Sequence, residues 1–576
     1  MTDLPDTKPA ARNIFFLRPA LTLATILGSA SFAFADDTPS CNTPVGLDGT
    51  ALECGVGASA QSANATAIGS NATANGVDAL AVGDTAVANG NSTTAVGGES
   101  VATAPGNTAI GWQAEATGAF GTALGHQTTA SGDQSIAAGE DAVASGYGAI
   151  AVGGNNAGGQ DAGASASGED SIAIGAGASS VGNSSTVLGG EAVANGAGTT
   201  AIGWQSVAIG ERAQAFGHLA TAQGIRSMAI GENADAQSDL STAIGNESIA
   251  AGTDALAIGD TSLANGNSTT AIGGESVAVG AGTTAIGWQS MATAERAQAF
   301  GHLATAQGVR SLAIGENADA QTDLSTAIGN ESIAAGTDAL ALGDTSQAIG
   351  NSTTAIGGES VAMGAGATAI GWQSMATAER AQAFGHLAQA TGVRSTAVGE
   401  GAVASGANSL SFGNLASASG ANSAAIGNGA TATRDNQFVL GNASNTYTAT
   451  GIASQASRDA QSGEVGYVTS DASGNLAVDR SIGSRMSSLS NQVDRNAREI
   501  QNNKEGIAMA MAMDAPYVPA DATFAVSSAL GHFEGSSAVA VSMGFRTNEN
   551  VQFDAGISYG TDRNQVGGRI GMTYAW

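Results

Sequence analysis

The chain has 576 residues, of which 83 are glycine, 4 % are aromatic and 12 % are charged. This composition leaves too little bulk for a series of ordinary globular cores. The formal net charge of −30 at pH 7 repels nucleic acid and anionic membrane surfaces, so nucleic acid is not expected as a partner. Such a chain must bury small residues by regular stacking or remain disordered.

Residues 1–35 have the pattern of a secretory signal peptide. Lys8, Arg12 and Arg18 precede an apolar run that ends in the small-residue pattern Ala33-Phe34-Ala35, which is typical of a cleavage site. The apolar run is too short for a transmembrane helix. We therefore expect the chain to be exported.

Residues 36–60 are predicted to form an N-terminal tip. They contain Cys41 and Cys54, the two cysteines of the chain. In an oxidising compartment a disulfide is the expected state of two such neighbours. The sequence leaves open whether they pair within one chain or between chains. No histidine lies nearby, so a metal site is not expected there.

A fourteen-residue repeat dominates the chain from residue 61 to residue 433. An apolar residue followed by glycine recurs from Gly69 to Gly441, with one longer step between Gly153 and Gly175. The residue before the apolar one is usually alanine, and Ser or Thr is common two positions earlier. In a strand these alternating positions face opposite sides, with the large apolar residue on one side and the small one on the other. Each unit must bury its face against its neighbours, which predicts a β-solenoid.

The repeat also resembles a known family. The stretches "NSTTAIGGES" (Asn267–Ser276) and "DSIAIGAGA" (Asp170–Ala178) look like the head repeats of YadA-like trimeric autotransporter adhesins (type Vc secretion). The resemblance implies a head made of three left-handed parallel β-rolls. The longer step contains a Gly-, Asn- and Ser-rich segment, Asn155–Gly168, which we expect to be a loop that stands out from the roll.

Two short segments are expected to connect the head to a stalk. Residues 434–453, "RDNQFVLGNASNTYTATGIA", are similar to the neck of this family. Residues 454–481 are expected to be a connector, because "GYVTSDASGNLAVD" has two short strand-like runs around Asp471–Gly474, the pattern of a hairpin.

Residues 482–514 are predicted to form a coiled-coil stalk and a helix in the lumen of the anchor. Met486, Leu489, Val493 and Ile500 are spaced by three, four and seven residues, which is a heptad seam. Asn496 and Asn503 continue it at d-type positions, where polar residues fix register or oligomer number. The family resemblance implies that these asparagines can hold an anion on the trimer axis. An ordinary solvated helix is the alternative.

Residues 515–576 are predicted to form an outer-membrane β-barrel anchor. Four segments alternate apolar with small or polar residues: Thr523–Leu530, Ser537–Phe545, Val551–Tyr559 and Val566–Trp576. This is the pattern of transmembrane β-strands. Four strands cannot close a barrel, and an open edge is not stable in lipid. Three chains would supply twelve strands, which agrees with a trimeric coiled coil.

The aromatic residues of these strands are expected to anchor the chain in the membrane: Phe553, Tyr559, Tyr574 and Trp576. The segment Gly506–Tyr517, "GIAMAMAMDAPY", resembles the family segment that fills the barrel. Trp576 resembles the aromatic end by which the outer-membrane barrel assembly machinery recognises its substrates, so this machinery is an expected partner.

Together these segments predict an all-β protein with a coiled coil. Its parts are a trimeric left-handed parallel β-roll head, a neck, a short trimeric coiled-coil stalk and a 12-stranded transmembrane β-barrel with four strands per chain. We expect the anchor to lie in a Gram-negative outer membrane and the head on the cell surface.

Tryptophan and histidine occupy one column of the repeat. Trp112, Trp204, Trp288 and Trp372 each follow a punctuating glycine directly, and a histidine follows the next such glycine. From Trp204 onward the pattern recurs every 84 residues. Trp is favoured in binding hot spots, and repeated weak sites add through avidity. The alternative is duplication of a block whose tryptophan caps the roll or packs between chains.

A second column carries arginines, including Arg296 and Arg310, and we regard these as further candidate adhesive residues. A metal site made of three histidines on the trimer axis would lack carboxylate or cysteine support, so no metal is expected. No catalytic arrangement of residues and no cofactor motif is found. An acyltransferase built on a left-handed β-helix would need a six-residue period, which is absent.

We therefore expect a surface adhesin, and not an enzyme, that attaches to host extracellular matrix, host cell-surface ligands or other surfaces. Its head would be translocated through its own C-terminal barrel. The alternative is a self-associating structural protein that causes autoagglutination and biofilm formation. The expected partners are two further copies of the chain, the barrel assembly machinery and these ligands.

Overall fold

The computed structural model describes Cys41 and residues 49–155 and 162–576. The predicted signal peptide (1–35), most of the predicted tip before residue 49 and residues 156–161 of the predicted loop lie outside the described residues. The chain forms two compact units, of which the first ends at Asn445 and the second runs from Thr446 to Trp576.

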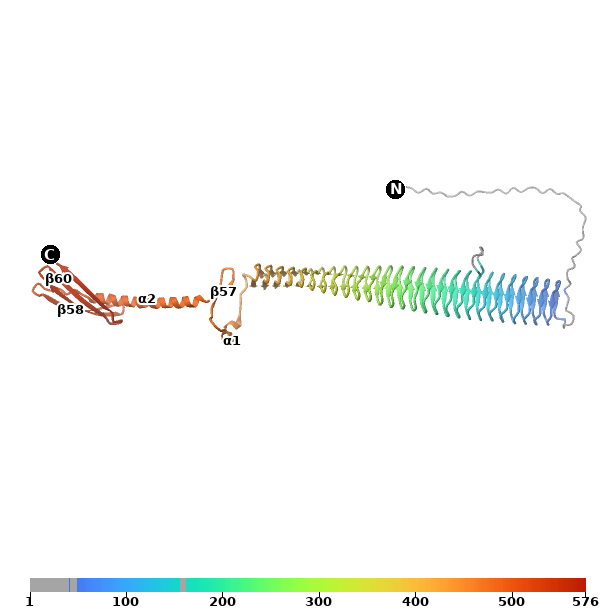
Figure 1. The fold of residues 1–576 in the computed structure, drawn as a ribbon, viewed down its shortest axis with the longest axis horizontal. Coiled ribbons are helices and arrows are strands. Elements are labelled where there is room, and N and C mark those ends of the chain that lie inside the picture. The colour runs from blue at the N-terminus through green and yellow to red at the C-terminus, as the bar shows by residue number, and fades with distance from the viewer. Residues whose placement is uncertain (1–40, 42–48, 156–161) are drawn as a thin grey trace, which may run out of the picture. The chain divides into compact units, whose positions relative to one another are not determined.

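The first unit is a stack of fourteen-residue rungs, visible as the long ladder in Figure 1. Each rung has a first strand of three residues and a second strand that usually has two, as in β27 (Thr242–Ile244) and β28 (Ile249–Ala250). The first strands form a 28-stranded parallel sheet that includes β1 (Leu52–Cys54) and β55 (Phe438–Leu440). The second strands form another parallel sheet, from β2 (Ser59–Ala60) to β54 (Thr431–Ala432). The predicted parallel β-solenoid is confirmed.

Alanine fills the space between the two sheets. In a typical rung Ala243 and Ala250, one from each sheet, are fully buried. Among the described residues of the head, the buried apolar side chains are alanines, with Val187 as the exception. Small side chains thus fill this interior, as dense packing between two sheets requires.

The large aliphatic residues lie on the outer face of the 28-stranded sheet. Ile110 and Leu188 are 42 % and 47 % exposed in the single chain, while their neighbours Ala109 and Val187 are fully buried. An apolar outer face of this kind is available for packing against other chains. The sequence pattern did not show that the small residue, and not the large one, faces the interior of the roll.

The punctuating glycines allow adjacent rungs to approach closely at their turns. Gly259 has φ +136°, and a Cβ placed on it would stand 2.4 Å from the carbonyl oxygen of Gly273 in the next rung. The other turn of the rung explains the recurring Ser and Thr, since the Thr269 hydroxyl donates to the Gly266 carbonyl at 2.8 Å. The buried hydroxyl thereby satisfies a polar group of the turn.

The stack begins before the predicted head boundary at residue 61. Leu52–Cys54 pair in register with Thr66–Ile68, so this segment forms a rung although it lies in the predicted tip. The repeat pattern is broken there, because Glu53 and Cys54 occupy the usual alanine and aliphatic positions. The Glu53 carboxylate accepts a hydrogen bond from the Ala60 amide at 2.7 Å. Cys54 is joined to Cys41 by a disulfide within the chain.

The segment Asn155–Gly168 adds no rung of its own, but the prediction that all of it is a loop is wrong, because Ser165–Ala166 form strand β16 of the stack. On one side of it β15 (Ile150–Val152) pairs with β17 (Ile172–Ile174) across the insertion. On the other side β14 (Val143–Ala144) pairs with β16 (Ser165–Ala166). The ladder is therefore continuous past the inserted residues. At the far end, the last rung β55 falls within the segment 434–453 predicted as neck.

The second unit begins with short elements and one long helix. These are η1 (Thr450–Ala453), α1 (Gln455–Asp459), the hairpin β56 (Tyr467–Ser470) and β57 (Leu476–Asp479), and α2 (Ser481–Ala512). Met486, Leu489, Val493 and Ile500 on α2 are all more than half exposed in the single chain. Apolar residues at heptad spacing that remain exposed are suited to helix–helix association.

The start of α2 provides a test of pH dependence. The Asp479 carboxylate accepts hydrogen bonds from the hydroxyl and the amide of Ser481, both at 2.7 Å, and these bonds hold the pKa of Asp479 below its usual 3.8. Because the folded pKa is depressed, the stabilisation is present above pH 3.8 and is lost as the pH falls through the folded pKa. We expect the amides of the first turn of α2 to exchange faster in this acid range. Asp479→Asn should show no such step, and an identical step in both proteins would contradict the assignment.

Four antiparallel strands complete the chain: β58 (Phe524–Phe533), β59 (Ser536–Arg546), β60 (Val551–Gly560) and β61 (Val566–Tyr574). The predicted four strands per chain are confirmed. Among the described residues, no helix is long and apolar enough to cross a membrane.

The C-terminal part of α2 packs on one face of this sheet, as Figure 1 shows. Ala508, Met509 and Ala512 cluster with Ala538 and Ala540 of β59. The four alanines of this cluster let the helix lie close to the strands. The fully buried Glu505 accepts hydrogen bonds from the amides of Asp562 and Arg563, so the helix is also tied to the turn between β60 and β61.

Candidate functional site: an aromatic edge of the head

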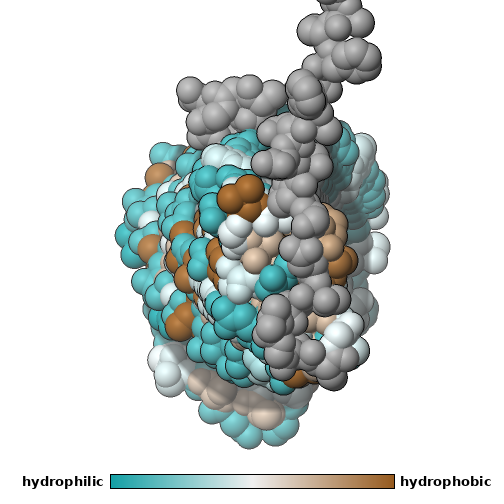
Figure 2. Space-filling view, turned by 90° about the vertical axis from the view of Figure 1, so that its right-hand side faces the viewer, coloured by the Kyte–Doolittle hydropathy of each residue, from teal (hydrophilic) through white to brown (hydrophobic). Residues whose placement is uncertain are grey.

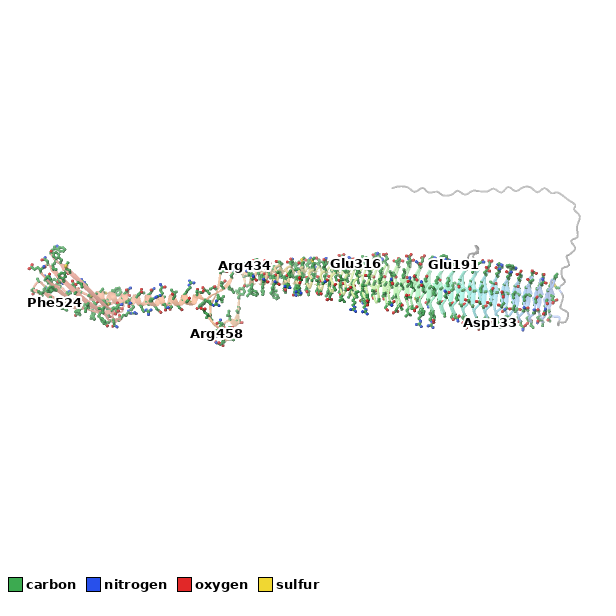
Figure 3. All side chains as sticks on the ribbon, viewed as in Figure 1. Asp133, Glu191, Glu316, Arg434, Arg458 and Phe524 are labelled. Atoms are coloured by element: carbon green, nitrogen blue, oxygen red, sulfur yellow. A yellow bond between two sulfur atoms is a disulfide. The ribbon has the colours of Figure 1, made fainter. Side chains whose placement is uncertain are left out.

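Each rung has two turns, and they lie at opposite edges of the solenoid. After β21 (Thr200–Ile202) the first turn, which contains Trp204, leads to β22 (Val207–Ala208) in the other sheet. After β22 the second turn, which contains Arg212, returns to β23 (Gln214–Phe216) in the first sheet. We call the stacked first turns the Trp edge and the stacked second turns the Arg edge. Figure 3 shows Glu191 and Glu316 of the Trp edge on one side of the stack and Asp133 of the Arg edge on the other.

Each tryptophan of the Trp edge stacks on the histidine of the next rung. The ring centroids of Trp288 and His302 are 4.9 Å apart with an interplanar angle of 25°. The other three pairs have the same arrangement, with centroids 4.8 to 5.0 Å apart: Trp112–His126, Trp204–His218 and Trp372–His386. Stacked aromatic pairs contribute about 0.5–1.5 kcal/mol beyond the area they bury. The stack therefore holds each indole in a fixed orientation.

A glutamate in the following rung holds each histidine in turn. Nδ1 of His302 lies 3.2 Å from Oε1 of Glu316, and the equivalent distances for the other three pairs are 2.9 to 3.3 Å: His126–Glu140, His218–Glu232 and His386–Glu400. Three consecutive rungs thus contribute Trp, His and Glu to one column. All these glutamates are exposed, so the bonds orient the rings more than they stabilise the fold.

The rung before each tryptophan carries a glycine in the same column. A Cβ placed on Gly274 would stand 3.1 Å from Cδ1 of Trp288, and the corresponding distances from Gly98, Gly190 and Gly358 to their tryptophans are 3.1 to 3.3 Å. Beside this glycine a glutamate binds the residue that follows the tryptophan, as in Gln289 Nε2 to Glu275 Oε2 at 2.7 Å. The indoles are 46–48 % exposed, so each presents a rigid, half-exposed aromatic surface.

The visible end of the head is covered mainly by hydrophilic residues, with separate hydrophobic ones among them (Figure 2). Half-exposed tryptophans on a surface of this kind are suited to contact with a ligand. Within the described residues, no group of three or more His, Cys, Asp and Glu is placed to hold a metal ion.

The arginine column lies on the opposite edge from the tryptophans. Arg296 and Arg310 come from consecutive rungs, and Arg296 is 3.9 Å from the neighbouring Glu295. The pair recurs as Arg212–Arg226 and Arg380–Arg394. The sequence places these arginines close to the Trp-bearing turns, but within one chain the structure does not bring the two sets together.

The other predicted site residues lie in the second unit. Asn496 and Asn503 are exposed on α2, on the side that carries the heptad residues. Phe553, Tyr559, Tyr574 and Trp576 are all exposed, and the Tyr559 hydroxyl donates to Asn564. Their roles as register or anion-binding residues and as membrane-anchor residues remain predictions.

Sequence reasoning missed the glycine above each tryptophan and the Gln–Glu pairs beside it. The sequence does carry a signal for the glycine. At fourteen-residue steps the column has the order Asp, Gly, Trp, His, Glu. This order begins at Asp260, Gly274 and Trp288 and occurs again at Asp344, Gly358 and Trp372. The meaning of the glycine becomes clear only when these positions are known to stack directly over one another.

The architecture is that of a repetitive surface head followed by a membrane anchor, and comparison with known proteins agrees. The model of the YadA head domain repeat matches segments between residues 74 and 436 that make up more than half of the chain. The model of the YadA-like membrane anchor domain matches residues 516–576. The chain belongs to the family of YadA-like trimeric autotransporter adhesins. It is anchored in the outer membrane with its head exposed, and it is not an enzyme.

One solved structure similar to the chain is the crystal structure of the collagen-binding domain of the Yersinia adhesin YadA. It is 25 % identical, covers 33 % of this chain and 85 % of that one, and has a TM-score of 0.19. No curated protein matches the chain.

Proposed function

We propose that the head attaches the cell to host matrix, host cell-surface ligands or other surfaces through its Trp edge. The observation that supports this is the repeated column in which each indole is stacked on a histidine and still half exposed. A rigid aromatic group loses little conformational freedom on binding, which favours affinity. After export through the trimeric barrel, each trimer would present three such edges, so weak contacts add through avidity.

The column repeats at equal heights along the head. Trp112, Trp204, Trp288 and Trp372 are separated by six rungs each, because the insertion between the first two adds residues but no rung. At about 4.8 Å per rung the interval is roughly 29 Å. A ligand with repeated binding groups could therefore contact several indoles at once.

We expect cells that display the chain with all four tryptophans replaced by alanine to attach at least about tenfold less, since hot-spot residues contribute about 2 kcal/mol or more each. Attachment would be measured on a panel of matrix proteins and on plastic, with display quantified on the same cells. The matched control is Phe120→Ala with Tyr147→Ala, because both residues are exposed aromatics of the Arg edge. Unchanged attachment of the tryptophan variant at normal display would contradict the proposal.

Self-association is a second candidate, and it is supported by the charges of the two edges. The Arg edge carries arginine pairs at six-rung intervals, while the Trp edge carries carboxylates such as Glu232, Asp260 and Glu275 with the same period. Two heads could therefore match opposite charges at several heights. Clumping of displaying cells that weakens with salt, and is lost when the six paired arginines are replaced by glutamine, would favour this function. Clumping unaffected by either change would exclude it.

A further inference from the structure

The glycine before each tryptophan leaves a slot one side chain deep in the Trp edge. In the best-defined case Asp260, Gly274 and Trp288 follow one another in consecutive rungs. A Cβ on Gly274 would lie 3.1 Å from Cδ1 of Trp288 and 3.8 Å from the carbonyl oxygen of Asp260. Asp260 and Trp288 are two rungs apart, which is roughly 10 Å. Gly274 contributes no side chain to the space between Asp260 and Trp288. The face of the indole that points toward Gly274 is therefore not covered by a side chain of that rung's column position.

The slot is flanked by carboxylates that have free oxygens. Oδ1 of Asp260 accepts from Asn246 and Oε2 of Glu275 accepts from Gln289, which leaves the second oxygen of each without a bond among the residues described here. The slots at Trp112 and Trp372 have the same residues in the same places: Asp84, Gly98 and Glu99 for the first, and Asp344, Gly358 and Glu359 for the second. The acidic residues of these slots are exposed.

The slot at Trp204 differs in one residue. Ala176 stands where the other slots have aspartate, although Gly190 and Glu191 are in place. The chain thus contains three slots with two carboxylates and one slot with a single carboxylate.

An indole face beside two carboxylates is a recognition site for a cation. A lysine ammonium or arginine guanidinium over a tryptophan face is attracted by the ring quadrupole, and charged hydrogen bonds to the carboxylates add to this attraction. We propose that each slot binds the cationic end of a lysine or arginine side chain of a partner protein. This inference rests on the proposed adhesive role of the Trp edge and specifies the chemistry of its ligand.

The charge of the molecule and the position of the slots favour such a ligand. The chain has a net charge of −30, which attracts basic proteins and raises their association rate. The turns of the Trp edge carry exposed glutamates and aspartates, and exposed charges resist burial against another chain. The Trp edge therefore remains in water when the apolar outer face of the 28-stranded sheet is covered in the trimer.

The test uses the purified full-length protein in detergent and the peptide octa-arginine as the probe, with binding followed by indole fluorescence and by calorimetry. The slot-filling variant combines Gly98→Asn, Gly274→Asn and Gly358→Asn. Asparagine is tolerated in this column, because Asn246, Asn330 and Asn414 already occupy it. None of the three glycines has a φ in the left-handed region. We expect octa-arginine affinity to fall about tenfold or more, in proportion to the loss of the cation–π contact.

Two variants that each remove three negative charges distinguish binding in the slots from attraction to the overall negative charge of the protein. Asp84→Asn, Asp260→Asn and Asp344→Asn together remove three carboxylates on the slot side of the tryptophans. Glu211→Gln, Glu295→Gln and Glu379→Gln remove three exposed carboxylates from the Arg edge, away from the slots and from the residues that orient the tryptophans. We expect the aspartate variant to lose affinity and the glutamate variant to keep it. Trp288→Ala should reduce binding more than Trp204→Ala, whose slot lacks the aspartate.

Three outcomes would overturn the proposal. The first is no binding of octa-arginine, and the second is an equal loss of octa-arginine affinity in the aspartate and glutamate variants. The third is quenching of the indole fluorescence by the neutral sugar maltohexaose and not by octa-arginine.

The attachment assay of the four-tryptophan variant is independent of this test. Lost attachment together with slot-independent peptide binding would leave the adhesive edge in place and reject the cation slot. Slot-dependent peptide binding with unchanged attachment would support the slot and reject the adhesive role.

Discussion

Replacement of Gly259 by alanine is expected to open the solenoid at that rung. The glycine has φ +136°, where other residues are strained, and the added Cβ would stand 2.4 Å from the Gly273 carbonyl oxygen. That oxygen belongs to the backbone of the next rung, so it cannot move without disturbing the ladder. We expect a local destabilisation of at least about 3 kcal/mol. It should be detected as new proteolytic cleavage between residues 250 and 280 and as a lower unfolding temperature.

Gly274→Ala is the matched control for this substitution. Gly274 lies in the following rung, does not have a φ in the left-handed region, and an added Cβ would first meet a side-chain atom of Trp288 at 3.1 Å. We expect this variant to keep the protease resistance of the native head. Equal sensitivity of the two variants would show that the turn glycines are not specifically required. Unchanged resistance of Gly259→Ala would contradict the close stacking of the rungs.

Replacement of Gly531 by valine is expected to abolish surface display. Gly531 lies in β58 where α2 crosses it, and a Cβ there would stand 2.1 Å from the carbonyl oxygen of Ala508 and 2.7 Å from the amide nitrogen of Ala512. The helix could not keep its position on the sheet, and the contacts of Ala508, Met509 and Ala512 with β59 would be lost with it. Overpacking by a whole side chain against the backbone costs several kcal/mol. We expect head antigen on intact cells to fall at least about tenfold.

The control for the anchor is Gly506→Ala. This glycine lies on the same helix, but a Cβ on it would have nothing within 4 Å in the chain. Alanine in a helix interior stabilises by about 0.5–1 kcal/mol relative to glycine, so display should be normal. Normal display of Gly531→Val would mean that the position of α2 on the sheet is not needed to anchor the head.

Much of the fold could be predicted from the sequence because the structure repeats a short rule. The apolar-Gly pair recurs every fourteen residues, and that step is the offset of the strand pairing, as in Thr242 to Leu256. The four predicted segments of the anchor correspond to β58–β61 for a similar reason, since apolar residues alternate with small or polar ones along each strand. Local patterns of this kind are sufficient to predict a fold in which each unit contacts only its neighbours.

What could not be predicted depends on distances between rungs and sheets. The composition predicted that small residues are buried, but the repeat did not show that the strand face with Ala243 and Ala250, and not the face with the large aliphatic residues, points inward. It did not show that the first rung contains Glu53 and Cys54, which break the pattern but keep the backbone pairing. It suggested that tryptophans and arginines are neighbours, although the chain crosses from one edge to the other between Trp204 and Arg212.

The constant pairing offset has a consequence for how this head can change over generations. Residues 285–304 and 369–388 are identical, and such segments are substrates for homologous recombination. From β17 onward, each strand of the head pairs with a strand fourteen residues away in the same register. Gain or loss of an 84-residue block would therefore rejoin strands of equivalent sequence. The head would lengthen or shorten in steps of six rungs, roughly 29 Å. Each step would also add or remove one tryptophan and its slot, so reach and valency would vary together.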